Sequence, residues 1–191
     1  MKSGLKVLLA IGAVILILVI SITGSYNNLV ARSENVESAW SLIDVQLQRR
    51  YDLIPNLVAT VKEYAAHEKE VFASVAEARS KLAGAGSVSE IAEADAELRG
   101  ALSRLLAIAE AYPELKANEN FINLQDELAG TENRIATARR DYNEAARSLN
   151  TTIRRFPTNI IAGMFGFESA DYFEASEASR ETPDVGDLFG D

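Results

Sequence analysis

An apolar segment near the N-terminus leads directly into a long helical pattern, and this junction constrains the fold most. Residues 7–22 are apolar except for one glycine and one serine, and Lys2 and Lys6 precede them. Counted over residues 5–23, the segment has nearly the ~20 residues that a helix needs to cross a hydrocarbon core. We therefore predict that residues 1–24 form a cytoplasmic N-terminus and a transmembrane anchor, inserted in the lipid bilayer through residues 5–23.

A cleaved signal peptide is the alternative interpretation of this segment. The sequence Ile22-Thr23-Gly24-Ser25 is a poor small-x-small cleavage site, which favours an uncleaved anchor. Positively charged flanks of a span stay in the cytoplasm, so we expect the rest of the chain on the opposite side of the membrane. Arg32, Arg49 and Arg50 follow the span and weaken this asymmetry.

The region after the span has the pattern of an all-α bundle, which we assign to residues 25–173. Apolar residues recur every three or four positions from Tyr26 to Leu82, which predicts one helix of about 85 Å. A shorter helix follows a capping box at Ser87 and Glu90, and a third extends from about residue 115 to residue 156. This spacing is typical of lengthwise, coiled-coil-like packing in an elongated antiparallel bundle. With one reversal on each side of the short helix, the two long helices are expected to run parallel.

One run of residues in the first predicted helix carries most of the local information. Pro55 lacks an N–H and its ring clashes with the carbonyl of Tyr51, so the helix either kinks and continues or restarts with Asp52 as its cap. The two arginines before it either face solvent, with Arg49 paired to Asp52, or place one arginine against a carboxylate at a buried helix contact. We interpret the run as an architectural joint formed by Arg49, Arg50, Asp52, Leu53, Ile54, Pro55 and Asn56.

The chain after Pro157 changes character twice. Its first part is rich in large apolar residues, and it either packs on the bundle, forms an oligomer contact or lies in the membrane interface. Residues 174–191 are acidic and have few large apolar side chains, so we predict a disordered tail. A C-terminal short helix in the apolar part would complete the long-short-long arrangement.

Composition and motifs favour a protein without catalytic chemistry. The net charge of −9 disfavours a nucleic-acid partner, and the absence of cysteine removes disulfides and thiolate ligands. The single histidine, His67, has the surroundings of a helix-surface residue, whereas a zinc site needs several His or Cys ligands. The chain has no nucleophile elbow, Walker loop or dinucleotide fingerprint. We predict no catalytic residues, no cofactor and no metal site.

The chain resembles the LemA family of bacterial membrane proteins over residues 5–173. The run from Arg49 to Val58 carries the resemblance, together with Tyr112-Pro113-Glu114-Leu115 and Arg139-Arg140-Asp141-Tyr142-Asn143. A membrane-proximal motif comprises Tyr26, Asn27, Leu29 and Val30. The resemblance fails in the acidic tail. It implies one N-terminal span, an elongated helical bundle and no known catalytic residues.

The function that these features favour is that of a non-enzymatic scaffold or adaptor. We expect it to be anchored in the bacterial inner membrane, with its helical domain periplasmic. We expect it to self-associate as a homo-oligomer and to bind an unidentified membrane or envelope protein. The alternative is a membrane-remodelling or envelope-stress protein that acts on the lipid bilayer itself.

Overall fold

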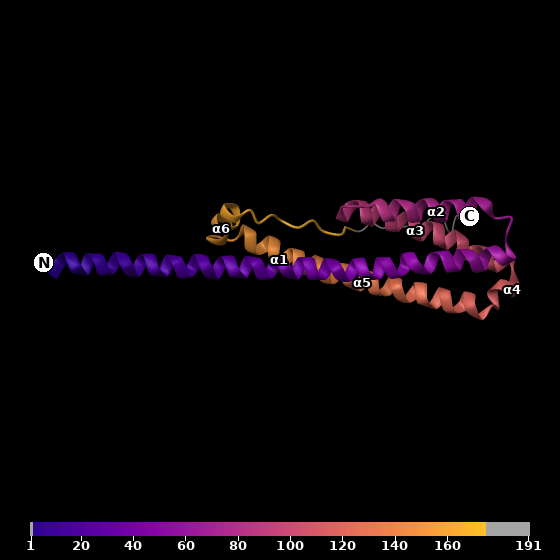
Figure 1. The fold of residues 1–191 in the computed structure, drawn as a ribbon, viewed down its shortest axis with the longest axis horizontal. Helices are drawn as coiled ribbons and strands as arrows, with labels where there is room; N and C mark the ends of the chain where they lie inside the picture. The colour runs from indigo at the N-terminus through magenta and orange to yellow at the C-terminus, as the bar shows by residue number, and fades with distance from the viewer. Residues whose placement is uncertain (1, 175–191) are drawn as a thin grey trace, which may run out of the picture. The chain divides into compact units, whose positions relative to one another are not determined.

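The computed structural model describes residues 2–174, and the side chains of residues 4–174, as an all-helical chain (Figure 1). The helices are α1 (Lys2–Tyr64), α2 (Lys69–Gly84), α3 (Val88–Ile108), η1 (Ala109–Ala111), α4 (Pro113–Lys116), α5 (Glu119–Arg154) and α6 (Thr158–Phe165). The predicted all-α class is confirmed. The predicted disordered tail lies outside the described residues, apart from Glu174.

Helix α1 begins with an apolar stretch that no other described part of the chain buries. Within it, Leu8 is 69 % exposed and Ile17 is 65 % exposed. Of the described helices, α1 is the one long and apolar enough to cross a membrane, by length and composition. The helix then passes through Pro55 and ends at Tyr64. The alternative in which Asp52 caps a new helix is therefore wrong.

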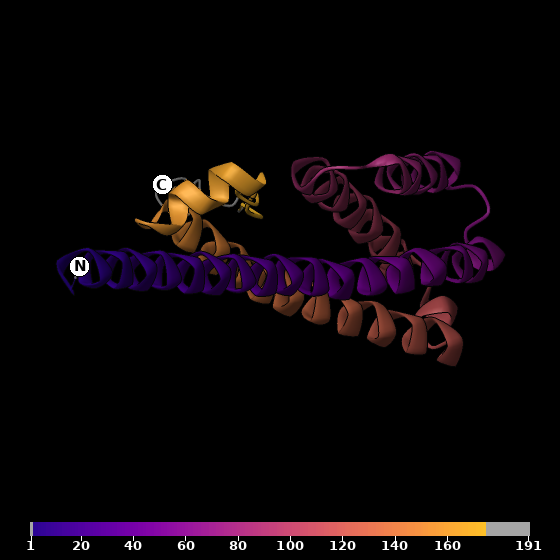
Figure 2. The ribbon, with the colours of Figure 1, turned by 60° about the vertical axis from the view of Figure 1, so that its left-hand side comes forward.

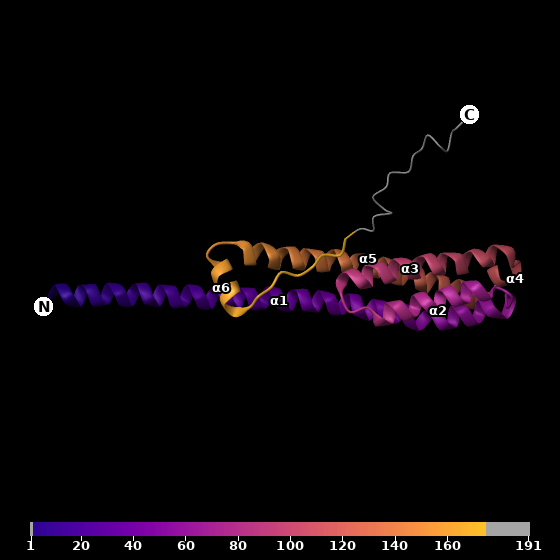
Figure 3. The same cartoon turned by 90° about the horizontal axis from the view of Figure 1, so that it is seen from above.

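The chain first reverses direction after α1 and not at its proline. The turn is closed by backbone hydrogen bonds from the N–H of Ala65 to the carbonyl of Val61 (2.9 Å) and from the N–H of Glu68 to the carbonyl of Ala65 (3.1 Å). The predicted single helix to Leu82 is wrong because the apolar spacing continues across this turn into α2. The extra reversal makes α5 antiparallel to α1, so the expected parallel arrangement is also wrong (Figure 3).

The chain divides into two compact units, each containing part of α1 and part of α5. The first comprises Met1–Ile43 and Ala138–Asp171, and therefore includes α6 (Figure 2). Its apolar core is formed by Leu29, Leu149, Ile161 and Ala162. Near the other end of this unit, the rings of Trp40 and Tyr142 meet edge to face, with centroids 5.7 Å apart.

The second unit comprises Asp44–Thr137 and Tyr172–Asp191, and the α2–α3 hairpin belongs to it. The predicted capping box at the start of α3 is confirmed: Ser87 Oγ accepts the N–H of Glu90 (3.2 Å), and Glu90 Oε2 accepts the N–H of Ser87 (3.1 Å). The N–H of Gly86 donates to the same oxygen at 2.9 Å. These bonds lower the pKa of the Glu90 carboxyl, the one from Gly86 most. The apolar core includes Ile54, Leu57, Val61, Leu98, Leu105, Leu115, Phe121 and Ile135.

Candidate functional site

A buried arginine lies at the centre of the second unit. Arg50 is 2 % exposed. Its Nη1 donates to Asp95 Oδ1 of α3 at 2.5 Å, and its Nη2 donates to Glu132 Oε2 of α5. Arg50 thus ties α1 to two helices that follow it by 45 and 82 positions in the sequence.

A second arginine closes the ion pairs into a network. The Nε atom of Arg99 lies 3.5 Å from Asp95 Oδ2, and its Nη1 lies 3.3 Å from Glu132 Oε1. Two cations and two anions are therefore matched at one contact of α1, α3 and α5. We call Arg50, Asp95, Arg99 and Glu132 the arginine network. Taking charges out of water costs several kcal/mol per ion, and such pairing with hydrogen bonds offsets that cost.

The burial of Arg50 follows from its position on the core-facing side of α1. The buried residues of this part of the helix are Ile43, Leu47, Arg50, Ile54, Leu57 and Val61. Arg50 therefore occupies a core position at helical spacing. Apolar spacing alone does not reveal this position, because Tyr51 next to it also continues the three-four spacing from Leu47 to Ile54. The available signal is that Arg50 itself fits the same spacing between these two residues.

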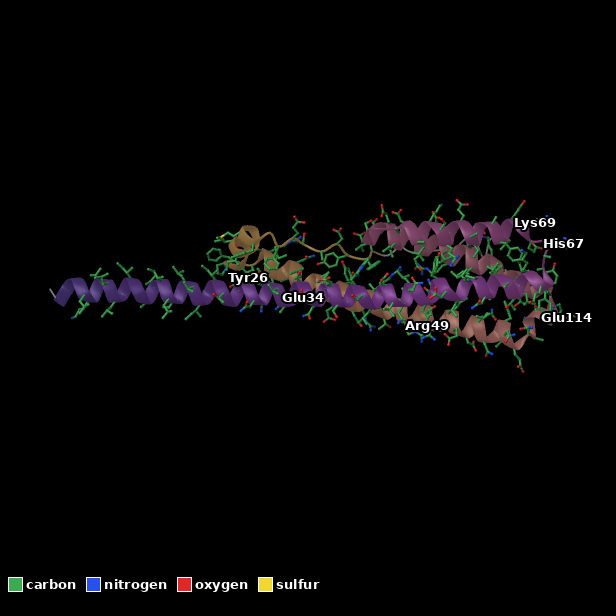
Figure 4. All side chains as sticks on the ribbon, viewed as in Figure 1. Tyr26, Glu34, Arg49, His67, Lys69 and Glu114 are labelled. Carbon is green, nitrogen blue, oxygen red and sulfur yellow. The ribbon has the colours of Figure 1, made fainter. Side chains whose placement is uncertain are left out.

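Residues on either side of Arg50 have different surroundings. Arg49 is about half exposed, and its Nη2 lies 2.7 Å from Glu127 Oε2 of α5 (Figure 4). The ring of Tyr51 stacks beneath the guanidinium of Arg79 from α2, with Cζ 3.6 Å from the ring centroid. Asp52 accepts a hydrogen bond from Gln48 and not from Arg49. Of the two alternatives for the arginine pair, the buried contact is observed for Arg50 and an exposed pair with a different acid for Arg49.

The remainder of the predicted joint alternates between core and surface. Ile54 is buried and Leu53 is half-buried, whereas Pro55 and Asn56 are exposed. The carbonyl of Asn56 accepts a hydrogen bond from Thr60 Oγ1 at 2.9 Å. The helix is thus continuous through this run, and its role as an architectural joint stays a prediction.

The membrane-proximal motif lies in the first unit and packs against α6 and the segment after it. The ring of Tyr26 lies 4.8 Å from that of Phe165 and 5.8 Å from that of Phe167, between centroids (Figure 4). Leu29 is fully buried. Asn27 is exposed and Val30 is half-buried.

Polar contacts hold the C-terminal segment of this unit in place. The side chain of Asn150 is 5 % exposed. Its Nδ2 donates to the carbonyl of Ala170, and its Oδ1 accepts the N–H of Ala170, both at 2.8 Å. Sequence spacing does not identify Asn150 as an anchor, because its partner is a backbone group 20 residues away.

Two further polar groups of this unit have distinct surroundings. Burial, with a smaller contribution from Asp171, raises the pKa of Tyr142. Arg32 donates from Nε to Asn28 Oδ1 at 2.8 Å and from Nη1 to Ser148 Oγ.

The polar groups described above are paired with one another, as ion pairs in the arginine network and as amide hydrogen bonds at Asn150. Within residues 2–174, no group of three or more His, Asp or Glu side chains is placed to hold a metal ion. His67 lies exposed in the turn after α1 (Figure 4). In the arginine network both carboxylates face arginines, an arrangement suited to fixing the register of three helices.

The sequence matches the model of one protein family over most of its length. The model of the LemA family matches residues 39–186. The chain belongs to the LemA family. The match includes the arginine network and extends to residue 186, so the expectation that the resemblance fails in the acidic tail is wrong.

Two kinds of relative are similar to this chain over most of its length. Magnetosome protein MamQ 1 of Paramagnetospirillum magneticum is 31 % identical, over 83 % of this chain and 67 % of the relative. Magnetosome protein MamQ of Magnetospirillum gryphiswaldense is 28 % identical with the same coverage. Protein LemA of Metamycoplasma hominis is 29 % identical, over 86 % of this chain and 76 % of the relative.

Proposed function

We propose that this LemA-family protein is a non-enzymatic scaffold or adaptor anchored in the bacterial inner membrane. The observation that carries the proposal is the continuity of α1. One helix contains both the exposed apolar stretch and Arg50, with no intervening break between residues 2 and 64. Such a helix links membrane insertion directly to the packing of the bundle, as a scaffold requires.

The arginine network supports a structural role over a catalytic one. A catalytic carboxylate has to present an oxygen to substrate, and its pKa is matched to a proton-transfer step. Asp95 has a side chain that is 1 % exposed and contacts both Arg50 and Arg99. These groups stabilise a helix contact and leave Asp95 out of reach of a substrate.

Self-association is the second part of the proposal. Leu42 on the first unit is 56 % exposed, and on the second unit Val45 and Ile122 are 59 % and 42 % exposed. A contiguous apolar patch on a bundle surface favours contact with a further helical surface, and we propose that these side chains belong to such patches. A homo-oligomer, or a complex with a membrane or envelope protein, would cover them.

Chemical cross-linking of the full-length protein in native membranes tests the scaffold role. We expect oligomeric bands and co-purifying proteins, both weakened by Val45→Glu, which places a charge on an exposed apolar position. Ala59→Glu is the matched control, because it adds the same charge at an exposed small residue of the same helix. A strictly monomeric protein with no co-purifying partner would contradict the proposal.

We place the N-terminus in the cytoplasm and the helical domain in the periplasm. Lys2 and Lys6 before the span support this orientation through the positive-inside rule. Protease added outside spheroplasts should cleave beyond residue 25. Protection of the whole chain until the membrane is opened would reverse the assignment.

A second candidate function is action on the bilayer itself, and the surface of α6 favours it. Ile160 and Met164 on this helix are 53 % and 72 % exposed. Changes of vesicle shape on reconstituting the full-length protein would support this function. An unchanged vesicle population would leave the scaffold role in place.

A further inference from the structure

Helix α6 lies beside the part of α1 that leaves the predicted span. Tyr26 follows residue 23, the end of the span, by about 5 Å of helix rise. Its ring lies 4.8 Å from that of Phe165, the last residue of α6. Leu29, one turn further on, shares a core with Ile161 and Ala162. The ribbon shows α6 alongside α1 where the free N-terminal part of that helix begins (Figures 1 and 3).

This position places α6 at the depth of lipid headgroups. The headgroup region adds roughly 5–8 Å on each side of the ~30 Å hydrocarbon core. The contacts of α6 with Tyr26 and Leu29 fall within or just beyond that layer. At this depth α6 lies at a polar–apolar boundary, in which a mixed surface is stable.

One side of α6 packs on the first unit and the other side does not. Ile161 and Ala162 are buried against Leu29 and Leu149. The exposed side chains in and just before α6 are large and apolar, and Phe165 among them also contacts the ring of Tyr26. They are Phe156 (81 % exposed), Ile160 (53 %), Met164 (72 %) and Phe165 (53 %). A cluster of this kind next to a span favours insertion at the membrane interface.

The charges around this surface differ in sign from the rest of the chain. Residues 145–168 contain three arginines and one acid, Glu168, although the whole chain has a net charge of −9. Arg154 and Arg155 are exposed at the end of α5. Basic side chains next to an apolar helical face bind anionic lipid surfaces.

The antiparallel packing of α1 and α5 gives the depth of these arginines. Arg32 contacts Ser148, and residue 32 lies about 13 Å beyond residue 23 along the helix. Arg155 is seven residues further along α5 towards the membrane, which brings it back by about 10 Å. Arg155 therefore reaches the same level as Tyr26, where lipid phosphates lie.

We propose that α6, with Arg154 and Arg155, forms a second membrane contact. Phe156, Ile160, Met164 and Phe165 enter the interface, and the two arginines bind the phosphates of anionic phospholipids. The occupant is the bilayer that holds the anchor of the same chain, because α6 is beside the emerging span. The proposal rests on the membrane anchor in the proposed function and not on the scaffold role.

The absence of cysteine makes the test direct, because single-cysteine variants can be labelled at chosen sites. The full-length protein is reconstituted in vesicles of phosphatidylcholine and phosphatidylglycerol, with a nitrobenzoxadiazole label and doxyl-lipid quenchers. Met164→Cys reports on α6. Leu42→Cys is the matched control, because Leu42 is 56 % exposed and lies about 28 Å beyond residue 23 along α1. Ile15→Cys reports on the span.

We expect the Met164 label to be quenched several-fold more than the Leu42 label. Phe156→Cys should behave like Met164→Cys, so the test does not depend on one variant folding. Quenching at Ile15 with none above the Leu42 level at α6 would overturn the proposal and leave the anchor intact. Absence of quenching at Ile15 would remove the anchor, and both proposals with it.

A charge variant tests the headgroup contact. In the Met164→Cys background, Arg155→Glu should reduce quenching in phosphatidylglycerol vesicles several-fold and remove their difference from neutral vesicles. Arg140→Glu is the control, with the same charge change about 22 Å further along α5. Equal losses for both variants would overturn the proposal. So would a signal that follows the protein-to-lipid ratio, since a second copy would then cover α6.

Discussion

The two units treat their polar and apolar residues in opposite ways. The second unit buries charged groups, with Arg50 of α1 and Asp95 of the α2–α3 hairpin both almost inaccessible to solvent. The first unit has no corresponding hairpin, and apolar side chains of α6 such as Met164 remain exposed. The additional helices of the second unit thus allow charged side chains to be buried. The first unit has fewer helices, and part of its apolar surface stays exposed.

The contacts of the two units also contribute differently to the free energy of unfolding. A buried ion network contributes little net free energy but penalises any arrangement that separates its members. An apolar cluster such as that around Leu29 stabilises in proportion to the area it removes from water. Trp40, the single tryptophan, lies in the first unit and provides a local probe, whereas circular dichroism reports on both.

The largest effect should come from Arg50→Ala. Removing one member of a buried ion pair leaves an uncompensated charge and costs about 3–5 kcal/mol. Urea unfolding of the full-length protein in detergent, followed by circular dichroism, measures the loss. Arg49→Ala is the control and should cost only about 0–1 kcal/mol, because its pair with Glu127 is exposed. Equal effects of the two variants would contradict the assigned role of the network.

Leu29→Ala should have the next largest effect, confined more to the first unit. Truncating a fully buried leucine removes transfer free energy and leaves a cavity, at a cost of about 3 kcal/mol. The Trp40 fluorescence transition should shift to lower urea. Leu42→Ala, at an exposed position of the same helix, should leave the transition nearly unchanged. If Arg50→Ala shifts the Trp40 transition as much as Leu29→Ala does, the two units unfold together.

Pro55→Ala should stabilise the protein. Alanine restores the missing backbone N–H and removes the clash with the carbonyl of Tyr51, and we expect a gain of about 2 kcal/mol. The urea midpoint measures this gain, and cross-linking measures the assembly state. If helicity and assembly both stay unchanged, the joint assigned to this run is not a structural determinant.

The smallest effect should come from the cap of α3. Ser87→Ala removes the acceptor for the N–H of Glu90 and should cost about 1 kcal/mol, measured by thermal unfolding. Ser89→Ala, an exposed serine in the first turn, is the control. A cost no larger than that of the control would show that the capping box contributes nothing.

The same cap predicts a pH dependence. The pKa of Glu90 is lowered from its ordinary value of 4.5 by the backbone N–H groups of Gly86 and Ser87. Its contribution is therefore complete above the unfolded pKa and is lost as the pH falls through the lowered one. Glu90→Gln should flatten this part of the stability profile.

Features that depend on neighbouring residues could be predicted from the sequence. The apolar segment of α1, the helical class and the capping box at Ser87 all follow from composition and spacing within a few turns. The run from Arg49 to Val58, which carries the family resemblance, could also be recognised from the sequence. Each of these depends on backbone geometry or on side chains three or four positions apart, where local rules hold.

The position of the first chain reversal and the pairing of the charges became clear from the packed helices alone. The turn after Tyr64 has no proline or glycine, and the apolar spacing continues across it. Periodicity therefore gives no sign of the reversal. That reversal makes α1 and α5 antiparallel. It also allows Arg50 to meet Asp95 and Glu132, which are 45 and 82 positions away. The burial of an arginine depends on carboxylates from other helices, and no spacing along one helix encodes that meeting.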